Sequence, residues 1–143
     1  TGQEDIRVGV PVANRHRVDI EKVVGLFVNT QVLRNVMNDR MPLQAILERT
    51  RDAALDAQTY QDLPFDQLVE ALQPERSLHQ NPLFQTIFNH MREDYRALQQ
   101  LPGLTVEEHE LGEHGAQFEL MLDTIEKPDG SIEARFTFAA ELF

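Results

Sequence analysis

The sequence contains no cysteine, so a disulfide framework and a thiolate metal site are both excluded. It also lacks any apolar run that approaches the roughly 20 residues a membrane helix needs. Basic residues are scarce: 13 Lys and Arg stand against 24 Asp and Glu, and a formal charge of −11 repels a phosphate backbone. These absences predict no membrane partner and no nucleic-acid partner, and they favour a cytoplasmic location.

Catalytic and metal-binding motifs are also missing. There is no Gly-x-Ser-x-Gly elbow, and the glycines at 112 and 115 lack the Lys and the following helix of a phosphate loop. The five histidines are scattered, and His90 is expected to be a packed imidazole rather than a catalyst. Residues 107–114 contain metal-ligand types, but strand alternation would split them between two faces, which favours a solvated acidic edge. The sequence therefore predicts neither a catalytic residue nor a metal site.

The length of 143 residues suits one domain, residues 1–143, with its own hydrophobic core. The first residues lack an initiator Met and a leader pattern, and the last residues alternate like a strand up to Phe143. We therefore expect an excised piece of a larger protein.

Hydrophobic periodicity predicts both strands and helices. Period-2 alternation indicates strands over residues 6–12, 26–36, 83–91 and, more weakly, 104–111. Period-3.6 stripes indicate helices over residues 42–59 and 62–73, with Pro42 in a first turn and Pro74 as a stop. Alternation around Lys127-Pro128-Asp129-Gly130 indicates a hairpin, and residues 92–103 indicate a loop. This order predicts an α/β fold, an α+β two-layer sandwich in which helices cover mainly one face of a mixed sheet.

Three segments place polar residues or proline where an apolar element is expected. Asn29 lies in a strand and shares a face with Gln31, opposite Thr30, and from the residues alone its expected role is to satisfy a neighbouring loop. Asp62 and Asp66 indicate a helix start, with capping and dipole stabilisation as their expected roles. Asn81-Pro82 indicates a turn into a strand.

Arg15 follows Asn14 in a polar loop. From the residues alone, one interpretation of Arg15 is a solvated charge.

These segments resemble three motifs of one family, the condensation domains of nonribosomal peptide synthetases. The first resembles GxFVNT and comprises Gly25, Phe27, Val28, Asn29, Thr30 and Gln31, followed by Arg34. The second is similar to His/Asn-Gln-Asp-x-Pro-Phe-Glu at Gln61, Asp62, Pro64 and Phe65, with departures at Tyr60 and Asp66. The third resembles RDxSRNPL at Arg76, Asn81, Pro82 and Leu83, with a shift of one residue between them.

The resemblance implies the C-terminal lobe of such a domain, with a chloramphenicol-acetyltransferase-like fold. The family joins an aminoacyl or peptidyl thioester to an amine, both carried on phosphopantetheine arms, so no cofactor is expected to bind directly. Its catalytic HHxxxDG motif belongs to the N-terminal lobe, and no His-His pair occurs here. The implied partners are that N-terminal lobe, peptidyl carrier proteins and the adjacent adenylation domain. The lobe alone is expected to be inactive, with Asn29, Thr30 and Gln31 in the tunnel wall and Arg15 at the lobe interface.

Two other function classes stay open. One is a related acyltransferase of the same fold, either an epimerisation domain or a polyketide-associated acyltransferase. The other is a non-catalytic module that docks carrier proteins. The resemblance also implies that a complete condensation domain is a pseudo-dimer of two such lobes. One lobe alone exposes the surface that the other would cover, so we expect the fragment to self-associate through the GLFVNT strand or the hairpin at 127–130.

Overall fold

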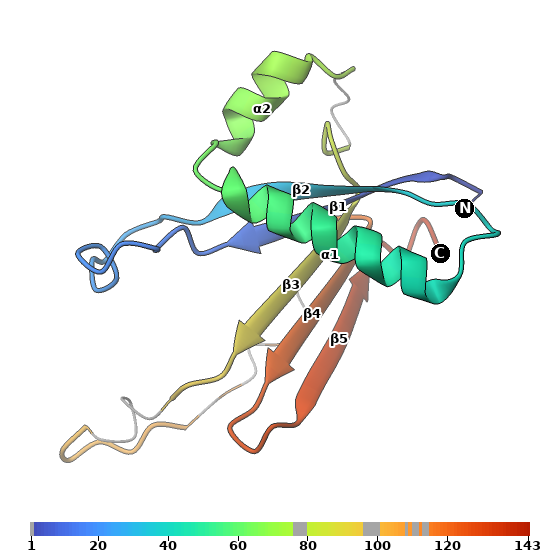
Figure 1. Cartoon of the computed structure of the whole chain (residues 1–143). Helices are drawn as coiled ribbons and strands as arrows, with labels where there is room; N and C mark the ends of the chain where they lie inside the picture. The colour runs from blue at the N-terminus through green and yellow to red at the C-terminus, as the bar shows by residue number, and fades with distance from the viewer. Residues whose placement is uncertain (1, 76–79, 96–100, 108, 110–111, 113–114) are drawn as a thin grey trace. The chain divides into compact units, whose positions relative to one another are not determined.

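The computed structural model describes residues 2–75, 80–95, 101–107, 109, 112 and 115–143. The chain divides into two compact units, residues 1–88 and residues 89–143. The strands follow the sheet order β2-β1-β3-β4-β5 (Figure 1), and the elements are β1 (Asp5–Val12), β2 (Asn29–Val36), α1 (Leu43–Thr59), α2 (Phe65–Leu72), β3 (Thr86–Arg92), β4 (Leu120–Glu126) and β5 (Ile132–Phe138). A mixed sheet with two helices confirms the predicted α/β class. The assignment of residues 1–143 to one domain stays a prediction.

Strands β1 and β2 form an antiparallel pair in the first unit. Their register runs from Asp5 opposite Val36 to Val12 opposite Asn29. The predicted β1 is confirmed, whereas β2 begins at Asn29 rather than at residue 26. Alternation along β2 places Asn29 and Gln31 on the face that contacts the helices, which confirms that they share a face.

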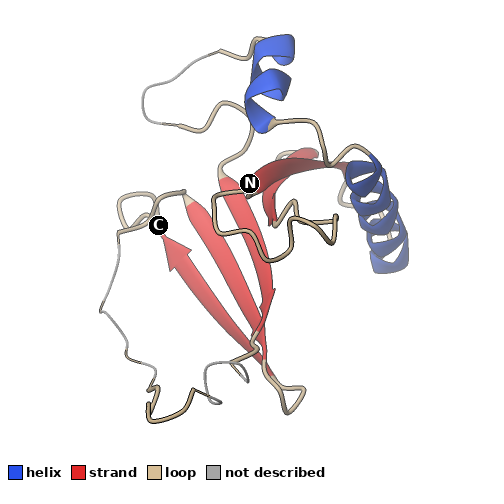
Figure 2. Ribbon diagram, turned by 90° about the vertical axis from the view of Figure 1, so that its left-hand side faces the viewer, coloured by secondary structure: helices blue, strands red, loops and turns tan. Residues whose placement is uncertain are grey.

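Each helix begins directly after a proline in extended conformation. Pro42 is the N-cap of α1 and Pro64 is the N-cap of α2, with ψ angles of 148° and 140°. Pro42 therefore lies just before the first turn rather than in it. Helix α2 ends because Gln73 takes a left-handed conformation, φ 45°, directly before Pro74, which disfavours helical geometry in the residue before it. Both helices contact β2, and α1 runs alongside it (Figures 1 and 2).

The buried core of the first unit is small. Among the described residues, the buried apolar side chains are Leu83, Phe84 and Ile87, and Phe84 is 2% exposed. The Phe84 ring packs edge-on against Phe65 of α2, with centroids 5.8 Å apart. Parallel pairing of β1 with β3 places Gly9 beside Ile87 and brings the Phe84 ring against Gly9.

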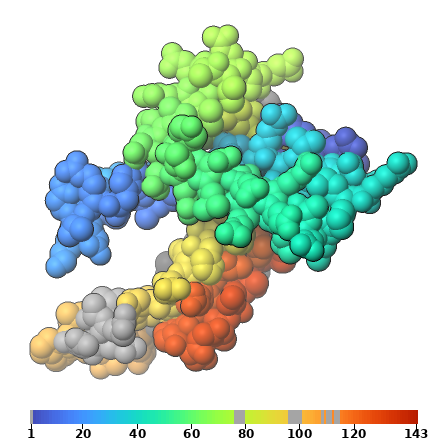
Figure 3. Space-filling model, viewed as in Figure 1, coloured from blue at the N-terminus to red at the C-terminus, as the bar shows by residue number. Residues whose placement is uncertain are grey.

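Much apolar surface of the first unit is uncovered. None of the residues of α1, all of which the structure describes, is buried, and Figure 3 shows this helix at the surface. Leu43 and Leu47 on α1 are 70% and 60% exposed. In the loop before β2, Val24 is 100% exposed and Leu26 is 90% exposed.

The second unit contains the predicted hairpin. Strands β4 and β5 are antiparallel, from Leu120 opposite Phe138 to Glu126 opposite Ile132. The Gly130 amide donates to the Lys127 carbonyl at 2.9 Å, and the Lys127 amide donates to the Ser131 carbonyl at 2.8 Å. Gly130 has φ 82°, in the left-handed region that favours glycine. The predicted turn is confirmed.

One predicted element is wrong. The expected strand at 104–111 is not formed in its described residues 104–107 and 109, where the alternating apolar residues Leu104 and Val106 are 66% and 48% exposed. Strand β3 begins at Thr86 rather than at residue 83, because Asn81 to Phe84 form a turn. The described residues of the predicted loop, 93–95 and 101–103, do lie outside helices and strands. Within the described part of the chain, no helix is long and apolar enough to cross a bilayer.

Candidate functional site

Asn29, the first residue of β2, holds the connection between α1 and α2. Its Nδ2 donates to the Gln61 carbonyl at 3.1 Å and to the Leu63 carbonyl at 2.8 Å. Its Oδ1 accepts the amide of Phe65, the first residue of α2, at 3.1 Å. A side chain from a strand therefore caps a helix that begins far along the chain. This geometry supports the loop-satisfying interpretation of Asn29, and its tunnel role stays a prediction.

Gln31, two residues along the same face, binds the end of the other helix. Its Nε2 donates to the Ala57 carbonyl in the last turn of α1, which also accepts the Tyr60 amide at 3.2 Å. The last carbonyls of a helix have no partner within the helix, so a side-chain donor there stabilises the end. Asn29 and Gln31 together fix where α1 stops and α2 starts.

The second motif contributes backbone groups to this arrangement and no side-chain cap. Gln61 offers its carbonyl to Asn29, and Pro64 is the N-cap residue of α2. The prediction that Asp62 caps this helix is wrong, because α2 has no side-chain cap from its own N-cap residue and Asn29 takes the Phe65 amide. Asp62 instead pairs with His16, whose Nε2 lies 3.1 Å from its Oδ1. Asp66 does lie in the first turn, as predicted.

Arg15 organises the loop that leads into β2. Its guanidinium donates to the carbonyls of Ile20 at 2.8 Å, Glu21 at 3.4 Å, Val23 at 2.7 Å and Gly25 at 2.9 Å. A solvated charge is therefore the wrong interpretation, because the planar fork of an Arg reaches several acceptors at once. A role at a lobe interface stays a prediction.

The motif residues Gly25 and Phe27 complete this arrangement. The Arg15 Cζ lies 4.3 Å from the centroid of the Phe27 ring, a cation–π contact. A Cβ on Gly25 would lie 3.2 Å from the Phe27 ring, tighter than an ordinary contact. Gly25 therefore lets the ring and the guanidinium approach the same turn. Val28, the next motif residue, is 57% exposed.

We expect Arg15→Lys to loosen this loop. An ammonium group is a point donor and does not span carbonyls from Ile20 to Gly25, so amide exchange across residues 20–25 should accelerate about tenfold, the equivalent of one or two lost hydrogen bonds. Hydrogen exchange followed by mass spectrometry measures this directly. The matched control is Arg17→Lys, because the Arg17 guanidinium pairs with the carboxylate of Asp19, its near neighbour in the same loop, and not with the carbonyls of residues 20–25. Equal protection in both variants would contradict the assignment.

The remaining β2 motif residues lie on the other face. Thr30 is half-buried opposite Pro11 of β1. Arg34 donates from Nε to Asp5 Oδ1 at 2.8 Å, and Arg7 donates to the second oxygen of Asp5 at 2.9 Å. The pKa of Asp5 lies below its usual value of 3.8, first because of the Arg34 bond and then because of the Arg7 bond. Arg34 thus joins the ends of β1 and β2.

The third motif forms the predicted turn into the core. Asn81 Oδ1 accepts the amides of Leu83 at 3.1 Å and Phe84 at 3.4 Å. This turn, with Pro82 inside it, directs Leu83 and Phe84 inward. Arg76 lies outside the described residues.

Two important residues were missed by the sequence analysis, Gly9 and Phe84. A Cβ on Gly9 would lie 2.4 Å from the Phe84 ring. A glycine inside an otherwise alternating strand marks a close approach, and that signal was available in the sequence.

The chemical groups of the motif residues are largely engaged within the chain. Among the described residues, no group of three His, Asp or Glu side chains could hold a metal ion. The imidazole of His90, on β3, is exposed, and its Nδ1 lies 2.9 Å from Oγ1 of Thr124. The prediction of a packed imidazole is therefore wrong. The arrangement of Asn29, Gln31 and Arg15 provides a rigid surface rather than a set of proton-transfer groups.

Comparisons with known proteins identify the family of this chain. The family model described as "Condensation domain" matches residues 1–143. Tyrocidine synthase 3 of Brevibacillus parabrevis is 41% identical over 142 residues, 99% of this chain and 2% of that protein. Malpinin synthetase of Mortierella alpina is 40% identical over 143 residues, 100% of this chain and 2% of that protein. The chain thus spans about 2% of the length of these curated relatives.

A solved structure shows the same fold. The chain superposes with a TM-score of 0.82 on a four-domain nonribosomal peptide synthetase bound to AMP and glycine, at 19% identity, over 97% of this chain and 12% of that chain. This likeness confirms the expected chloramphenicol-acetyltransferase-like lobe. With the family model matching every residue from 1 to 143, the chain belongs to the condensation-domain family of nonribosomal peptide synthetases.

Proposed function

We propose that this chain is the C-terminal lobe of a condensation domain whose parent enzyme forms an amide bond between carrier-bound substrates. The acceptor amine attacks the thioester carbonyl of the donor; the carbon–nitrogen bond forms, the carbon–sulfur bond breaks, and the amine proton passes to a base as the thiol is released. The observation that carries this proposal is the family match over residues 1–143. The chain has no His-His pair, so the base belongs to the N-terminal lobe.

The contribution of this chain is a rigid wall. Asn29 donates two hydrogen bonds and accepts one at the start of α2, and Gln31 donates one at the end of α1, which fixes these helix ends against β2. A fixed wall lowers the barrier by holding amine and thioester in an attack geometry, an effect that reaches about 7–11 kcal/mol in the best-oriented systems. We assign Asn29, Thr30 and Gln31 to this wall. The Thr30 side chain lies on the face of β2 away from the helices. Its hydroxyl is the group of this wall that would bind an amide of the substrate or of the phosphopantetheine arm.

The proposed reaction depends on carrier proteins and neighbouring domains. Donor and acceptor arrive on phosphopantetheine arms, and the lobe binds no cofactor of its own. Its partners are the N-terminal lobe, peptidyl carrier proteins and the adjacent adenylation domain, all in the cytoplasm. The exposed Val24 and Leu26 beside the β2 motif provide apolar surface for such partners.

The test compares the 143-residue chain alone with an intact synthetase that contains it. Both receive aminoacyl donor and acceptor on their carrier proteins, and dipeptidyl thioester is measured by mass spectrometry. We expect product from the synthetase and none from the chain alone. Product from the chain alone, lost on a substitution within it, would overturn the proposed division between lobes.

A variant of the intact synthetase tests the wall itself. Thr30→Val removes the hydroxyl and keeps the shape, so we expect a slower condensation step with unchanged melting. Gln58→Ala, an exposed amide on α1, is the matched control and should change neither. An unchanged rate for Thr30→Val would remove Thr30 from the wall.

A carrier-docking module without catalysis is the second candidate, favoured by the exposed apolar loop with Val24 and Leu26. Pull-down with a carrier protein that lacks its pantetheine arm separates the two. Equal capture with and without the arm, together with an unaltered rate in the Thr30→Val synthetase, would favour docking. An epimerising acyltransferase would instead invert the donor stereocentre, which chiral analysis of the thioester detects.

A further inference from the structure

Strand β5 is the last strand of the sheet order, so its outer edge has no neighbouring strand among the described residues. The bonds that flank the hairpin ladder join Lys127 to Ser131 and Ala139 to Glu119. Antiparallel pairs alternate between bonded and non-bonded positions, so the odd-numbered residues of β5 bond to β4. The backbone N–H and C=O groups of Ile132, Ala134, Phe136 and Phe138 therefore face outward.

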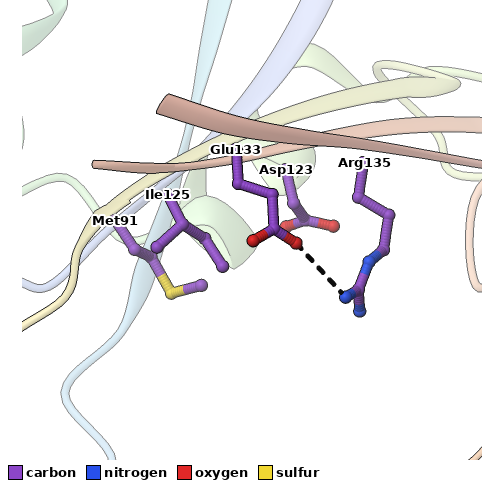
Figure 4. Close-up of a pocket in the computed structure, with 5 residues that line it drawn as sticks. All are labelled: Met91, Asp123, Ile125, Glu133 and Arg135. Carbon is purple, nitrogen blue, oxygen red and sulfur yellow. Dashed lines mark ion pairs between the residues drawn. The ribbon is translucent and has the colours of Figure 1, made fainter. Parts of the chain in front are cut away.

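The charges on this edge are self-complementary. Glu133 and Arg135 project to the same side of β5, and a guanidinium nitrogen of Arg135 lies 3.7 Å from Oε1 of Glu133 (Figure 4). Together with Met91, Asp123 and Ile125 they line an open hollow of about 230 Å³. In an antiparallel pair of two β5 strands centred on Ala134, each Glu133 would oppose the Arg135 of the other copy. Registers centred on Glu133 or Arg135 would instead oppose like charges, which is destabilising.

The opposite face of β5 is apolar and largely exposed, and the ring of Phe143 packs edge-on against Phe138. Ile132 is 64% exposed, Phe136 is 63% exposed and Phe138 is 51% exposed. In the register centred on Ala134, Ile132 of one strand lies opposite Phe136 of the other. Pairs of an aromatic and a β-branched residue stabilise antiparallel strands, and this strand contains no proline to block pairing.

We propose that β5 pairs edge to edge with β5 of a second copy of this chain, antiparallel and centred on Ala134, with Glu133 facing Arg135 across the interface. The self-association surface is thus strand β5 of the hairpin and not the GLFVNT strand. It is independent of the condensation activity, because it depends only on the edge groups and charges of β5.

Sedimentation equilibrium over a concentration series tests the pairing. We expect a reversible dimer of the 143-residue chain. Arg135→Glu and Glu133→Arg should each raise the dimer Kd about tenfold or more, because either change puts like charges opposite each other twice. An equimolar mixture of these two variants should regain the dimer, because the acidic pair of one variant then faces the basic pair of the other.

The matched control is Arg51→Glu, the same charge change at an exposed position of α1, which should leave the Kd unchanged. A second variant, Ala134→Pro, removes one outward N–H and no bond to β4, and it should give a monomer with the same circular dichroism. A monomeric wild-type chain at every concentration, or a mixture no more dimeric than its components, would overturn the proposal.

Discussion

Replacing Asn29 with Ala is expected to destabilise the chain by about 2 kcal/mol, at roughly 1 kcal/mol for each of the two part-buried hydrogen bonds lost to Gln61 and Phe65 and less for the exposed one to Leu63. The carbonyls of Gln61 and Leu63 and the amide of Phe65 would all lose their partner at once. The start of α2 should therefore fray first, and its amides should exchange faster than those of β1. Urea unfolding with hydrogen exchange measures both effects.

Asn29→Asp and Gln58→Ala make this result specific. The carboxylate of Asp keeps the acceptor for Phe65 but places an oxygen against the carbonyl oxygens of Gln61 and Leu63, so Asn29→Asp should cost at least as much as Asn29→Ala. Gln58 is exposed on α1, and its loss should cost less than about 0.5 kcal/mol. If Asn29→Ala unfolds at the same urea concentration as Gln58→Ala, Asn29 does not hold the helix connection.

Gly9→Ala is expected to cost about 3 kcal/mol, the upper range for overpacking a well-packed core. The new methyl group would lie 2.4 Å from the Phe84 ring, closer than real Cβ atoms approach. That ring is 2% exposed and packs edge-on against Phe65, so it has little room to move. Thermal and urea unfolding of the purified chain measure the loss.

A double-mutant cycle assigns the cost to this contact. In a Phe84→Leu background the smaller side chain leaves room for the methyl group, so Gly9→Ala should cost clearly less than in wild type. Gly115→Ala is the matched control, because nothing lies within 4 Å of a Cβ there and its backbone is outside the left-handed region. An equal cost of Gly9→Ala in both backgrounds would show that backbone strain, not Phe84, causes the loss.

The elements themselves could be predicted because their signals are local. Alternation in Ile6 to Val12 and the Lys127 to Gly130 turn specify β1 and the hairpin within a few residues of chain. Element ends were less predictable: β2 and β3 each begin three residues after the expected position, and before β3 the turn held by Asn81 takes Leu83 and Phe84. The described residues 104–107 and 109 lie outside any strand, which shows that weak alternation alone does not form a sheet.

The sequence by itself determined the strands, the helices, the hairpin and, through three motifs in order, the family. Only the tertiary structure decided what the motif side chains bind. Asn29 binds backbone groups of the connection between α1 and α2, 32 to 36 residues away, and Gly9 of β1 lies against the ring of Phe84 from the turn before β3. Periodicity reports which face a residue occupies, whereas its partner depends on which distant segments fold against that face.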